Sequence, residues 1–360
     1  MRVLVAPDKF AGTLTAVEAA EAIAAGWRRR APQDELDLAP MADGGPGFVD
    51  VLHASLGGEL LAVTVPGPYG EQVPAGVLVV DRTAYVEAAQ ACGLHLTPPE
   101  DRDPERATTY GVGLLVQQAI ESGADTVVVG LGGSGTNDGG AGFLAALGGT
   151  ADAPLDQGPL GLEHLTHLDL PSVPVRLVAA TDVDNPLLGL IGATKTYGGQ
   201  KGLAEERMPL VDRLLERLVT AADKRVALAK GAGAAGGLGY ALLLLGAERR
   251  PGVELVADAV GLAARAAAAD LVVTGEGAFD FSSRSGKVPY GVAAVASAAV
   301  RPCIALAGQV LVGARETRAL GIESAYSVSD LVGADLSLAD PAGSLATLAE
   351  RVARTWSRRA

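Results

Sequence analysis

The sequence predicts an α/β protein of two domains, and three observations lead to this prediction. Short apolar runs alternate with helix-forming segments along most of the chain, which is typical of buried parallel sheets. Residues 73–80 and 83–88 interrupt this alternation with a hairpin pattern that turns at Asp81 and Arg82. The chain has 360 residues, which is enough to build two hydrophobic cores.

The composition narrows the range of partners. A net charge of −13 argues against nucleic acid or an anionic membrane as a partner, because both require a concentrated basic surface. No apolar run reaches the roughly 18 residues that cross a membrane, and the N-terminus begins with a strand pattern rather than a signal peptide. Cys92 and Cys303 lie in apolar surroundings, so we expect two buried thiols in a cytoplasmic protein.

The first predicted strand, residues 2–6, ends in a loop that carries Asp8 and Lys9. Thr15, with Glu18 three places later, forms a capping-box pattern that predicts a helix through Trp27. Open α/β sheets bind their ligands at the carboxyl ends of their strands. Asp8 and Lys9 are therefore candidates for substrate binding, with a surface ion pair or a helix-entry turn as the alternative.

Asp43 occupies the equivalent position after the second predicted strand, residues 36–39, and is also a substrate-binding candidate. It precedes a glycine-rich turn and a predicted helix over 48–55. Residues 58–65 are expected to form the next strand. The Pro- and Gly-rich stretch 66–70 that follows marks a crossing into a second domain.

A glycine-rich loop, residues 130–142, lies between a Val-rich strand pattern at 126–129 and a helix-forming run at 143–147. Backbone N–H groups in such a loop can converge on a phosphate, and a helix start adds partial positive charge. The nucleotide-binding candidates of this loop are Gly132, Gly133, Ser134, Thr136 and Asn137. Its Asp138 is a candidate Mg²⁺ ligand. The alternative is a tight turn without a ligand.

Asp182 and Asp184 follow the predicted strand 175–180 and lie on one face of an extended segment. They could share a cation or divide the roles of general base and metal ligand; the alternative is a turn before Pro186. Lys201, in the glycine-rich stretch 192–202, is suited to phosphate neutralisation.

A second glycine run, residues 231–239, precedes another predicted helix. Gly233, Gly236 and Gly237 are nucleotide-binding candidates here, although a close packing corner would explain the glycines nearly as well. Glu276 follows the predicted strand 270–274, and Lys287 ends a donor-rich loop before a helix entry at Pro289. The remaining chain resumes a strand–helix alternation up to residue 356.

Ten collinear segments together resemble the bacterial glycerate kinase family of the glycerate 2-kinase type. They are 6–10 with 12–14, 42–45, 86–90, 109–113, 130–138, 182–186, 200–202, 231–239, 274–277 and 285–287. The resemblance implies a Rossmann- or flavodoxin-like domain, residues 1–64 and 283–360, with a second α/β domain, 65–282, inserted into it. It further implies that D-glycerate is phosphorylated in the cleft between them, with ATP and Mg²⁺ as cofactors.

The expected product is phosphoglycerate, with 2-phosphoglycerate favoured over 3-phosphoglycerate. The resemblance and the chemistry of phosphoryl transfer together suggest roles. Asp182 or Asp184 would act as base and metal holder, and Lys201 or Lys287 would contact the transferred phosphate. Asp138, Asp184 and Glu276 are the expected metal ligands.

Three residues depart from the usual family pattern, namely Ala11, Pro46 and Gly199. The first two lie near the expected acceptor site and could change its preference. The alternatives are therefore a kinase of a related small hydroxy acid, or a non-catalytic protein that binds a sugar acid or a nucleotide. The sequence leaves the oligomeric state open, a homo-oligomer included.

Overall fold

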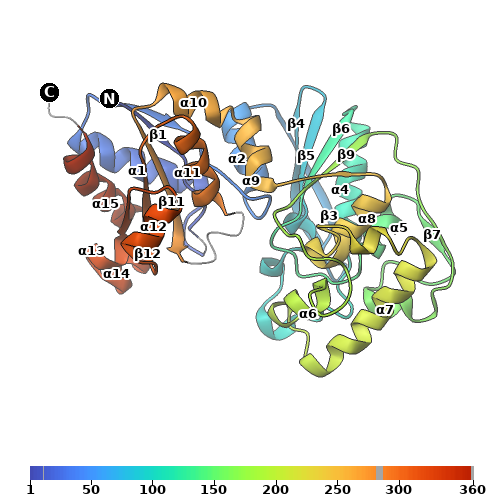
Figure 1. The fold of residues 1–360 in the computed structure, drawn as a ribbon. Helices are drawn as coiled ribbons and strands as arrows, with labels where there is room; N and C mark the ends of the chain where they lie inside the picture. Colours follow the sequence, from blue (N-terminus) through green and yellow to red (C-terminus); the bar gives the residue numbers. More distant parts are fainter. Residues whose placement is uncertain (11, 281–286, 358–360) are drawn as a thin grey trace. The chain divides into compact units, whose positions relative to one another are not determined.

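The computed structural model describes residues 1–10, 12–280 and 287–357, which form two compact units (Figure 1). The first unit comprises Met1–Asp43, Asp50–Gly57 and Gly252–Ala360, and the second comprises Gly44–Val49 and Gly58–Pro251. The expected boundary at 282/283 and the departure at Ala11 lie outside the described residues.

The sheet of the first unit is entirely parallel, with the order β13-β12-β11-β1-β2. Its strands are β1 (Arg2–Val5), β2 (Glu35–Leu38), β11 (Leu271–Phe279), β12 (Cys303–Val310) and β13 (Ser324–Ser327). Counted along the chain, this is the flavodoxin-like strand order. The predicted α/β class is confirmed, and β1 and β11 are the neighbours at which the winding direction changes.

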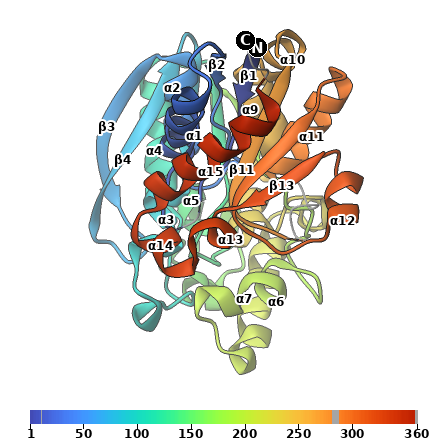
Figure 2. The same cartoon turned by 90° about the vertical axis from the view of Figure 1, so that its left-hand side faces the viewer.

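The helices α1 (Ala16–Arg30) and α15 (Pro341–Trp356) pack side by side against this sheet (Figure 2). Val3, Val273 and Ile304 point from the strands into the same core as these helices. The predicted capping box is confirmed: the Thr15 side chain accepts a hydrogen bond from Glu18 N, and the Glu18 carboxylate accepts one from Thr15 N at 2.8 Å. The first helix therefore begins where the sequence predicts.

The other helices of the first unit are mostly short. They are α2 (Phe48–Leu56), α9 (Gly252–Ala259), α10 (Leu262–Ala268), α11 (Val288–Ala298), α12 (Ala314–Ala319), α13 (Val328–Val332) and α14 (Ala334–Ala339). The first two residues of α2, Phe48 and Val49, belong to the second unit.

The second unit has a mixed sheet in the order β10-β9-β6-β5-β4-β3. The strands are β3 (Glu59–Pro66), β4 (Gln72–Val80), β5 (Thr83–Glu87), β6 (Thr126–Gly130), β9 (Arg176–Ala180) and β10 (Glu248–Arg250). The first three form an antiparallel meander that contains the predicted hairpin, and β5, β6, β9 and β10 are parallel. The loops after these parallel strands therefore share one edge of the sheet.

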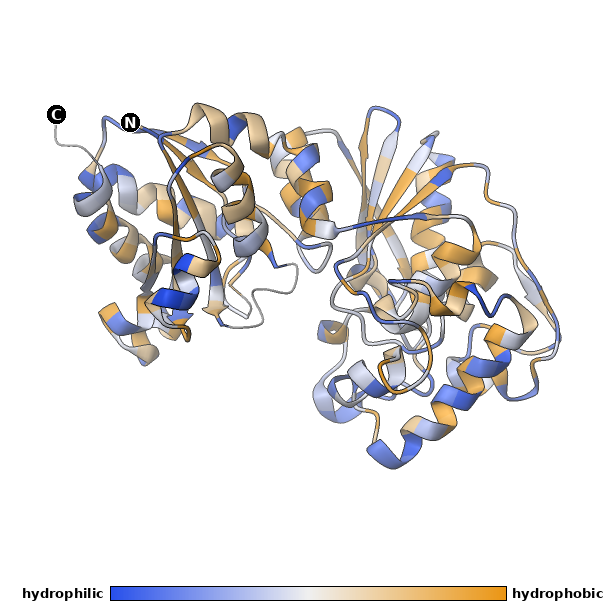
Figure 3. Cartoon of the chain, in the orientation of Figure 1, coloured by the Kyte–Doolittle hydropathy of each residue, from blue (hydrophilic) through white to orange (hydrophobic). Residues whose placement is uncertain are grey.

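The helices of the second unit are α3 (Ala89–Cys92), α4 (Tyr110–Glu121), α5 (Ala141–Ala146), α6 (Ala193–Tyr197), α7 (Met208–Ala221) and α8 (Leu238–Leu244). A small sheet pairs β7 (Thr150–Ala151) with β8 (Leu168–Asp169). Apolar residues line the strands, whereas α7 has one apolar face and one charged face (Figure 3). The helix α7 ends at Ala221, and a short 3₁₀ turn covers 226–228.

The unit boundaries differ from the predicted 64/65 and 282/283. The strand β3 pairs with β4 through eight residue pairs, so the second unit already resumes at Gly58. The strand β11 pairs with β1 and β12, which places residues 271–279 in the first sheet and returns the chain at Gly252. Within the described part of the chain, no helix is both long and apolar enough to cross a membrane.

Candidate active site

In the first unit, Asp8, Asp43 and Glu276 gather with Lys9 at the carboxyl ends of β1, β2 and β11. Backbone hydrogen bonds hold these strand ends together, since Asp8 N donates to Gly275 O at 2.8 Å and Met41 N donates to Pro7 O at 2.9 Å. Nζ of Lys9 lies 3.8 Å from Asp8 Oδ1 and 3.7 Å from Asp43 Oδ1. The sequence therefore predicted a group of residues that the fold brings together.

Burial and neighbouring charges change the acidity of Asp8. The residue is only 7% exposed, and burial raises the pKa of its carboxyl group to about 7. Lys9 opposes this rise, whereas the negative charges of Asp43 and Glu276 add to it. A carboxyl group with a near-neutral pKa can accept a proton from a substrate hydroxyl group. Three carboxylates with one nearby ammonium also form a site that a divalent cation would stabilise.

Lys287, one of the two lysines expected to contact the transferred phosphate, lies beside this acidic cluster. Its Nζ lies 3.9 Å from Glu276 Oε2 and 3.8 Å from Asp280 Oδ1. Asp280 was not predicted as a site residue. The signal was present in the sequence, because Asp280 follows Glu276 by four residues on an extended segment and so shares its face.

The described residues contain no preformed cage of three or more His, Cys, Asp or Glu side chains for a metal ion. Mg²⁺ sites of kinases commonly use one or two carboxylates together with substrate phosphates and water. The buried carboxylates of Asp8 and Glu276 fit such an incomplete site.

In the second unit, the glycine-rich loop presents only part of its length to solvent. Gly133 is exposed and Gly132 is half-buried, whereas Ser134, Thr136 and Asn137 are buried. Gly132 N donates to Gly44 O at 3.0 Å. Gly133 has a φ of +78°, and a Cβ there would lie 2.7 Å from Pro46 Cδ. The part of the loop most open to solvent is therefore the edge formed by Gly132 and Gly133.

Asp138 serves the loop itself. Its carboxylate accepts hydrogen bonds from Thr109 N and Oγ1, both at 2.8 Å, and from Gly140 N and Gly142 N. Burial raises its pKa, and these hydrogen bonds oppose the rise. The side chain is fully buried and occupies the start of α5, the position where the sequence suggested a phosphate. This environment favours a structural role for Asp138 over the predicted role of Mg²⁺ ligand.

Lys201 is likewise buried, with 3% of its surface exposed. Its ammonium donates to Ser134 Oγ at 3.1 Å and to Thr136 O at 2.6 Å. Burial lowers its pKa to about 8, and Cys92 and Asp138 oppose that shift. The structure thus joins Lys201 to the predicted nucleotide loop, but through protein groups on the buried side of that loop.

The two aspartates after β9 lie in different environments. Asp182 is half-buried beside the strand end. The exposed Asp184 contacts Lys230 at 3.1 Å and Arg249 at 2.6 Å, and these cations hold the pKa of Asp184 below its usual value. These two positive partners compensate the charge of Asp184.

The second glycine run packs against the first. A Cβ at Gly236 would lie 2.0 Å from Thr136 O, and one at Gly237 would lie 2.5 Å from Gly139 Cα. Gly233 is buried against Pro186 O in the same way. Close backbone contact therefore explains these glycines without a nucleotide.

Glu87 is a buried polar residue that the site prediction missed. It is 4% exposed, and its carboxylate accepts hydrogen bonds from Gly47 N at 3.0 Å and Val49 N at 3.4 Å. It ends β5, on the sheet edge that also carries the glycine-rich loop. The sequence could have indicated Glu87, because it is an acidic residue at the end of an otherwise mostly apolar strand.

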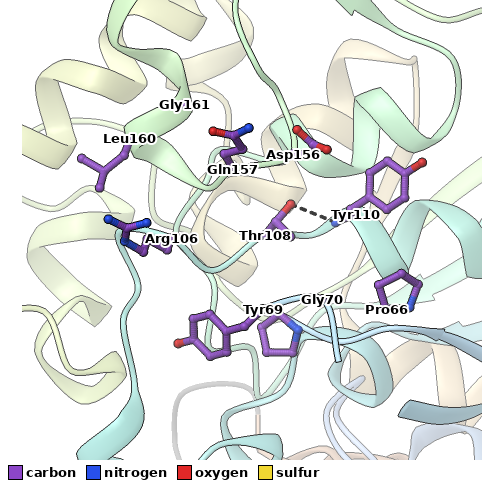
Figure 4. A pocket seen from close by; sticks show the side chains of 11 residues that line it. Pro66, Tyr69, Gly70, Arg106, Thr108, Tyr110, Asp156, Gln157, Leu160 and Gly161 are labelled. Carbon is purple, nitrogen blue, oxygen red and sulfur yellow. Dashed lines mark hydrogen bonds between the residues drawn. The ribbon is translucent and has the colours of Figure 1, made fainter. Parts of the chain in front are cut away.

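A pocket of about 720 Å³ lies elsewhere in the second unit, between the loop after β3, the start of α4 and residues 156–161 (Figure 4). Tyr69, Arg106 and Gln157 line it, and Tyr110 N donates to Thr108 Oγ1 at 3.2 Å in its wall. None of the predicted site residues lines this pocket. The sequence could not indicate it, because its walls come from three segments that are far apart along the chain.

The chain is similar to known proteins along nearly its whole length. The model of the glycerate kinase family matches residues 3–357. The chain is 38% identical to the glycerate kinase of Bacillus subtilis (strain 168), over 98% of this chain and 96% of the relative. It is 39% identical to the glycerate 2-kinase of Escherichia coli (strain K12), over 92% of each chain.

A solved structure provisionally named glycerate kinase 2, from Salmonella typhimurium LT2, matches with a TM-score of 0.83 and 35% identity. That match covers 99% of this chain and 98% of the other. Fold, motif order and sequence identity along nearly the whole chain thus lead to one conclusion: the chain belongs to the glycerate kinase family.

Proposed function

We propose that this protein transfers the γ-phosphoryl group of ATP to a hydroxyl group of D-glycerate, and that 2-phosphoglycerate is favoured over 3-phosphoglycerate. Family membership and the relative named glycerate 2-kinase support this proposal. The structural observation that carries it is the acidic cluster with two lysines at the point where the winding of the flavodoxin-like sheet changes direction. Open α/β sheets bind ligands at such points.

In this proposal, D-glycerate binds at Asp8, Lys9 and Asp43. The ammonium of Lys9 attracts the carboxylate of glycerate, and Asp43 accepts a hydrogen bond from a glycerate hydroxyl group. Asp8 accepts the proton of the hydroxyl group that attacks the phosphate. Its near-neutral pKa supports this role, which the sequence analysis had given to Asp182 or Asp184.

The nucleotide is proposed to bind at the exposed edge of Gly132 and Gly133, whose backbone can approach a phosphate closely. Mg²⁺, when bound, neutralises phosphate charge. Glu276, whose negative charge acts on the neighbouring Asp8 in the first unit, is proposed as a metal ligand. Lys287 is proposed to contact the transferred phosphate, where a flexible ammonium can follow the moving charge.

A coupled assay of ADP release with D-glycerate, ATP and Mg²⁺ tests the activity. We expect ADP release that depends on all three components, and NMR of the product should show phosphate on O2. Parallel reactions with hydroxypyruvate and tartronate test a preference for another acid. Turnover of one of these without turnover of D-glycerate would reject the proposed substrate, and no ADP release with any of them would reject the proposed activity.

A further inference from the structure

The buried face of the glycine-rich loop is held by a cation that is almost inaccessible to solvent. Lys201 is 3% exposed, and its Nζ contacts Ser134 Oγ at 3.1 Å and Thr136 O at 2.6 Å. The exposed member of this loop is Gly133 instead. A phosphate at the exposed edge would therefore meet the backbone of the loop before it met the Lys201 ammonium.

The segment that carries Lys201 is itself well fixed. Lys201 N and Leu203 N both donate to Gly198 O, at 3.0 and 2.9 Å. Earlier in the same segment, Thr194 Oγ1 accepts a hydrogen bond from Asn137 Nδ2 at 3.0 Å. Two side chains of residues 194–201 thus hold the loop at Ser134, Thr136 and Asn137.

The segment around Cys92 holds the loop by a separate set of contacts. Leu94 N donates to Gly133 O at 2.9 Å, and Gly135 N donates to Cys92 O at 2.7 Å. A glycine-rich loop samples many backbone conformations unless its surroundings restrict it. The contacts to Cys92 and Lys201 together provide this restriction.

The surroundings of Lys201 leave its amine mostly protonated at neutral pH. Asp138 favours the charged form electrostatically, while burial lowers the pKa of Lys201 to about 8. Burial raises the pKa of the Cys92 thiol to about 12, so this thiol stays neutral. At neutral pH a charged donor therefore faces the Ser134 hydroxyl and the Thr136 carbonyl, and hydrogen bonds from charged donors are the stronger kind.

We propose that Lys201 is a positioning residue: it fixes Ser134 and Thr136 from the buried side, so that the edge at Gly132 and Gly133 keeps the shape that receives the nucleotide phosphates. This inference rests on the proposed nucleotide site. It gives Lys201 a different role from the phosphate contact that the sequence suggested.

The variant Lys201→Met tests this inference, because methionine has an unbranched side chain of similar length but lacks the charge and both hydrogen bonds. We expect the KM for ATP to rise about ten- to a hundredfold, the range given by losing hydrogen bonds from a charged donor. The kcat and the KM for D-glycerate should change much less. Lys224→Met, at an exposed lysine after α7, is the matched control and should match the unchanged enzyme.

The partner residue gives a second test. Ser134→Ala removes one acceptor of the Lys201 ammonium and should raise the KM for ATP by a smaller factor. If Lys201 acts through this residue, the double variant should be little worse than Lys201→Met alone. Fully multiplicative effects of the two substitutions would contradict action through Ser134.

Hydrogen exchange of the loop peptide, measured without nucleotide, separates this inference from the proposed function. Faster exchange at residues 132–137 in Lys201→Met, or in Ser134→Ala if the first variant does not fold, supports positioning. Affinity for Mg-ADP should fall in parallel, even if D-glycerate proves not to be the substrate. Unchanged exchange together with a large loss of kcat would show that Lys201 contacts the phosphate directly. Unchanged exchange together with unchanged kinetics would show that Lys201 has no role in nucleotide binding. Either result would overturn the inference.

Discussion

Asp8 holds a buried carboxylate beside two others at the end of a central strand. Its exposure of 7% and the nearby Asp43 and Glu276 raise its pKa to about 7, although Lys9 lies 3.8 Å away. Packing carboxylates together costs free energy of folding, and such arrangements are concentrated at functional sites. The raised pKa of Asp8 therefore suits the proposed role of general base, and the same burial lowers the stability of the folded protein at neutral pH.

The first prediction concerns activity. Asp8→Asn keeps the size of the side chain but cannot accept the hydroxyl proton, so kcat should fall by about a hundredfold or more. Asp50→Asn, at an exposed position on α2, is the control and should retain activity. A kcat for Asp8→Asn within a few-fold of the unchanged enzyme would remove Asp8 from the role of base.

The second prediction concerns stability as a function of pH. The pKa of Asp8 is raised in the folded state from 3.8 to about 7, so the folded protein binds this proton more tightly than the unfolded chain. Stability from this group is therefore present below about pH 4 and is lost as the pH rises through 7.

Replacement of Asp8 by Asn removes this loss. At pH 8 the free energy of unfolding of Asp8→Asn should exceed that of the unchanged protein, by at most about 4 kcal/mol. Near pH 4 the two proteins should be equally stable. Thermal unfolding at both pH values measures the difference, and equal stability at pH 8 would contradict the pKa assigned to Asp8.

The sequence predicted which charged residues lie together where it places them directly after a strand. The structure brings Asp8, Lys9 and Asp43 together because the carboxyl ends of parallel strands meet at one edge. Asp138 and Lys201 belong to a predicted loop, yet both face protein groups rather than solvent. The sequence alone does not show whether a loop side chain faces solvent or protein groups. That direction depends on segments from elsewhere in the chain that pack against the loop.

Among the elements, the pair α1 and α15 shows how one residue allows close packing. Gly26 lies within α1, where glycine disfavours a helix. A Cβ at this position would lie 1.9 Å from Ala346 O in α15. The absence of a side chain therefore lets the two helices approach each other over the sheet.

The third prediction follows from this contact. Gly26→Ala should destabilise the protein by about 1–3 kcal/mol, since the steric clash outweighs the gain in helix propensity. Chemical denaturation measures the change. Ala25→Ser, at the neighbouring exposed position, serves as the control. A Gly26→Ala protein as stable as the parent would show that α15 can shift without cost.

Local signals predicted the elements more accurately than the domain boundaries. The capping box of α1 and the hairpin of β4 and β5 involve residues close in sequence, and both were predicted where they occur. The strand β11 was predicted, but its partner β1 is far away along the chain. No local pattern indicates that pairing, so residues 271–279 were assigned from the sequence to the inserted domain, whereas the structure pairs them with β1 of the first unit.

At the scale of the whole molecule, the strand order of the first unit explains why we place the proposed glycerate site at β1 and β11. Helices leave the sheet in opposite directions from these neighbours, which opens space at their carboxyl ends. Chain segments around residues 8, 43 and 276 then supply the charged groups. We propose that the charged groups of Asp8, Lys9 and Asp43 bind D-glycerate.

A crystal structure of the protein with D-glycerate, Mg²⁺ and a non-hydrolysable ATP analogue tests this claim most directly. We predict that the carboxylate of glycerate lies within hydrogen-bonding distance of Lys9 and that its reacting hydroxyl group donates to Asp8. Glycerate bound away from Asp8, Lys9 and Asp43 would contradict the account.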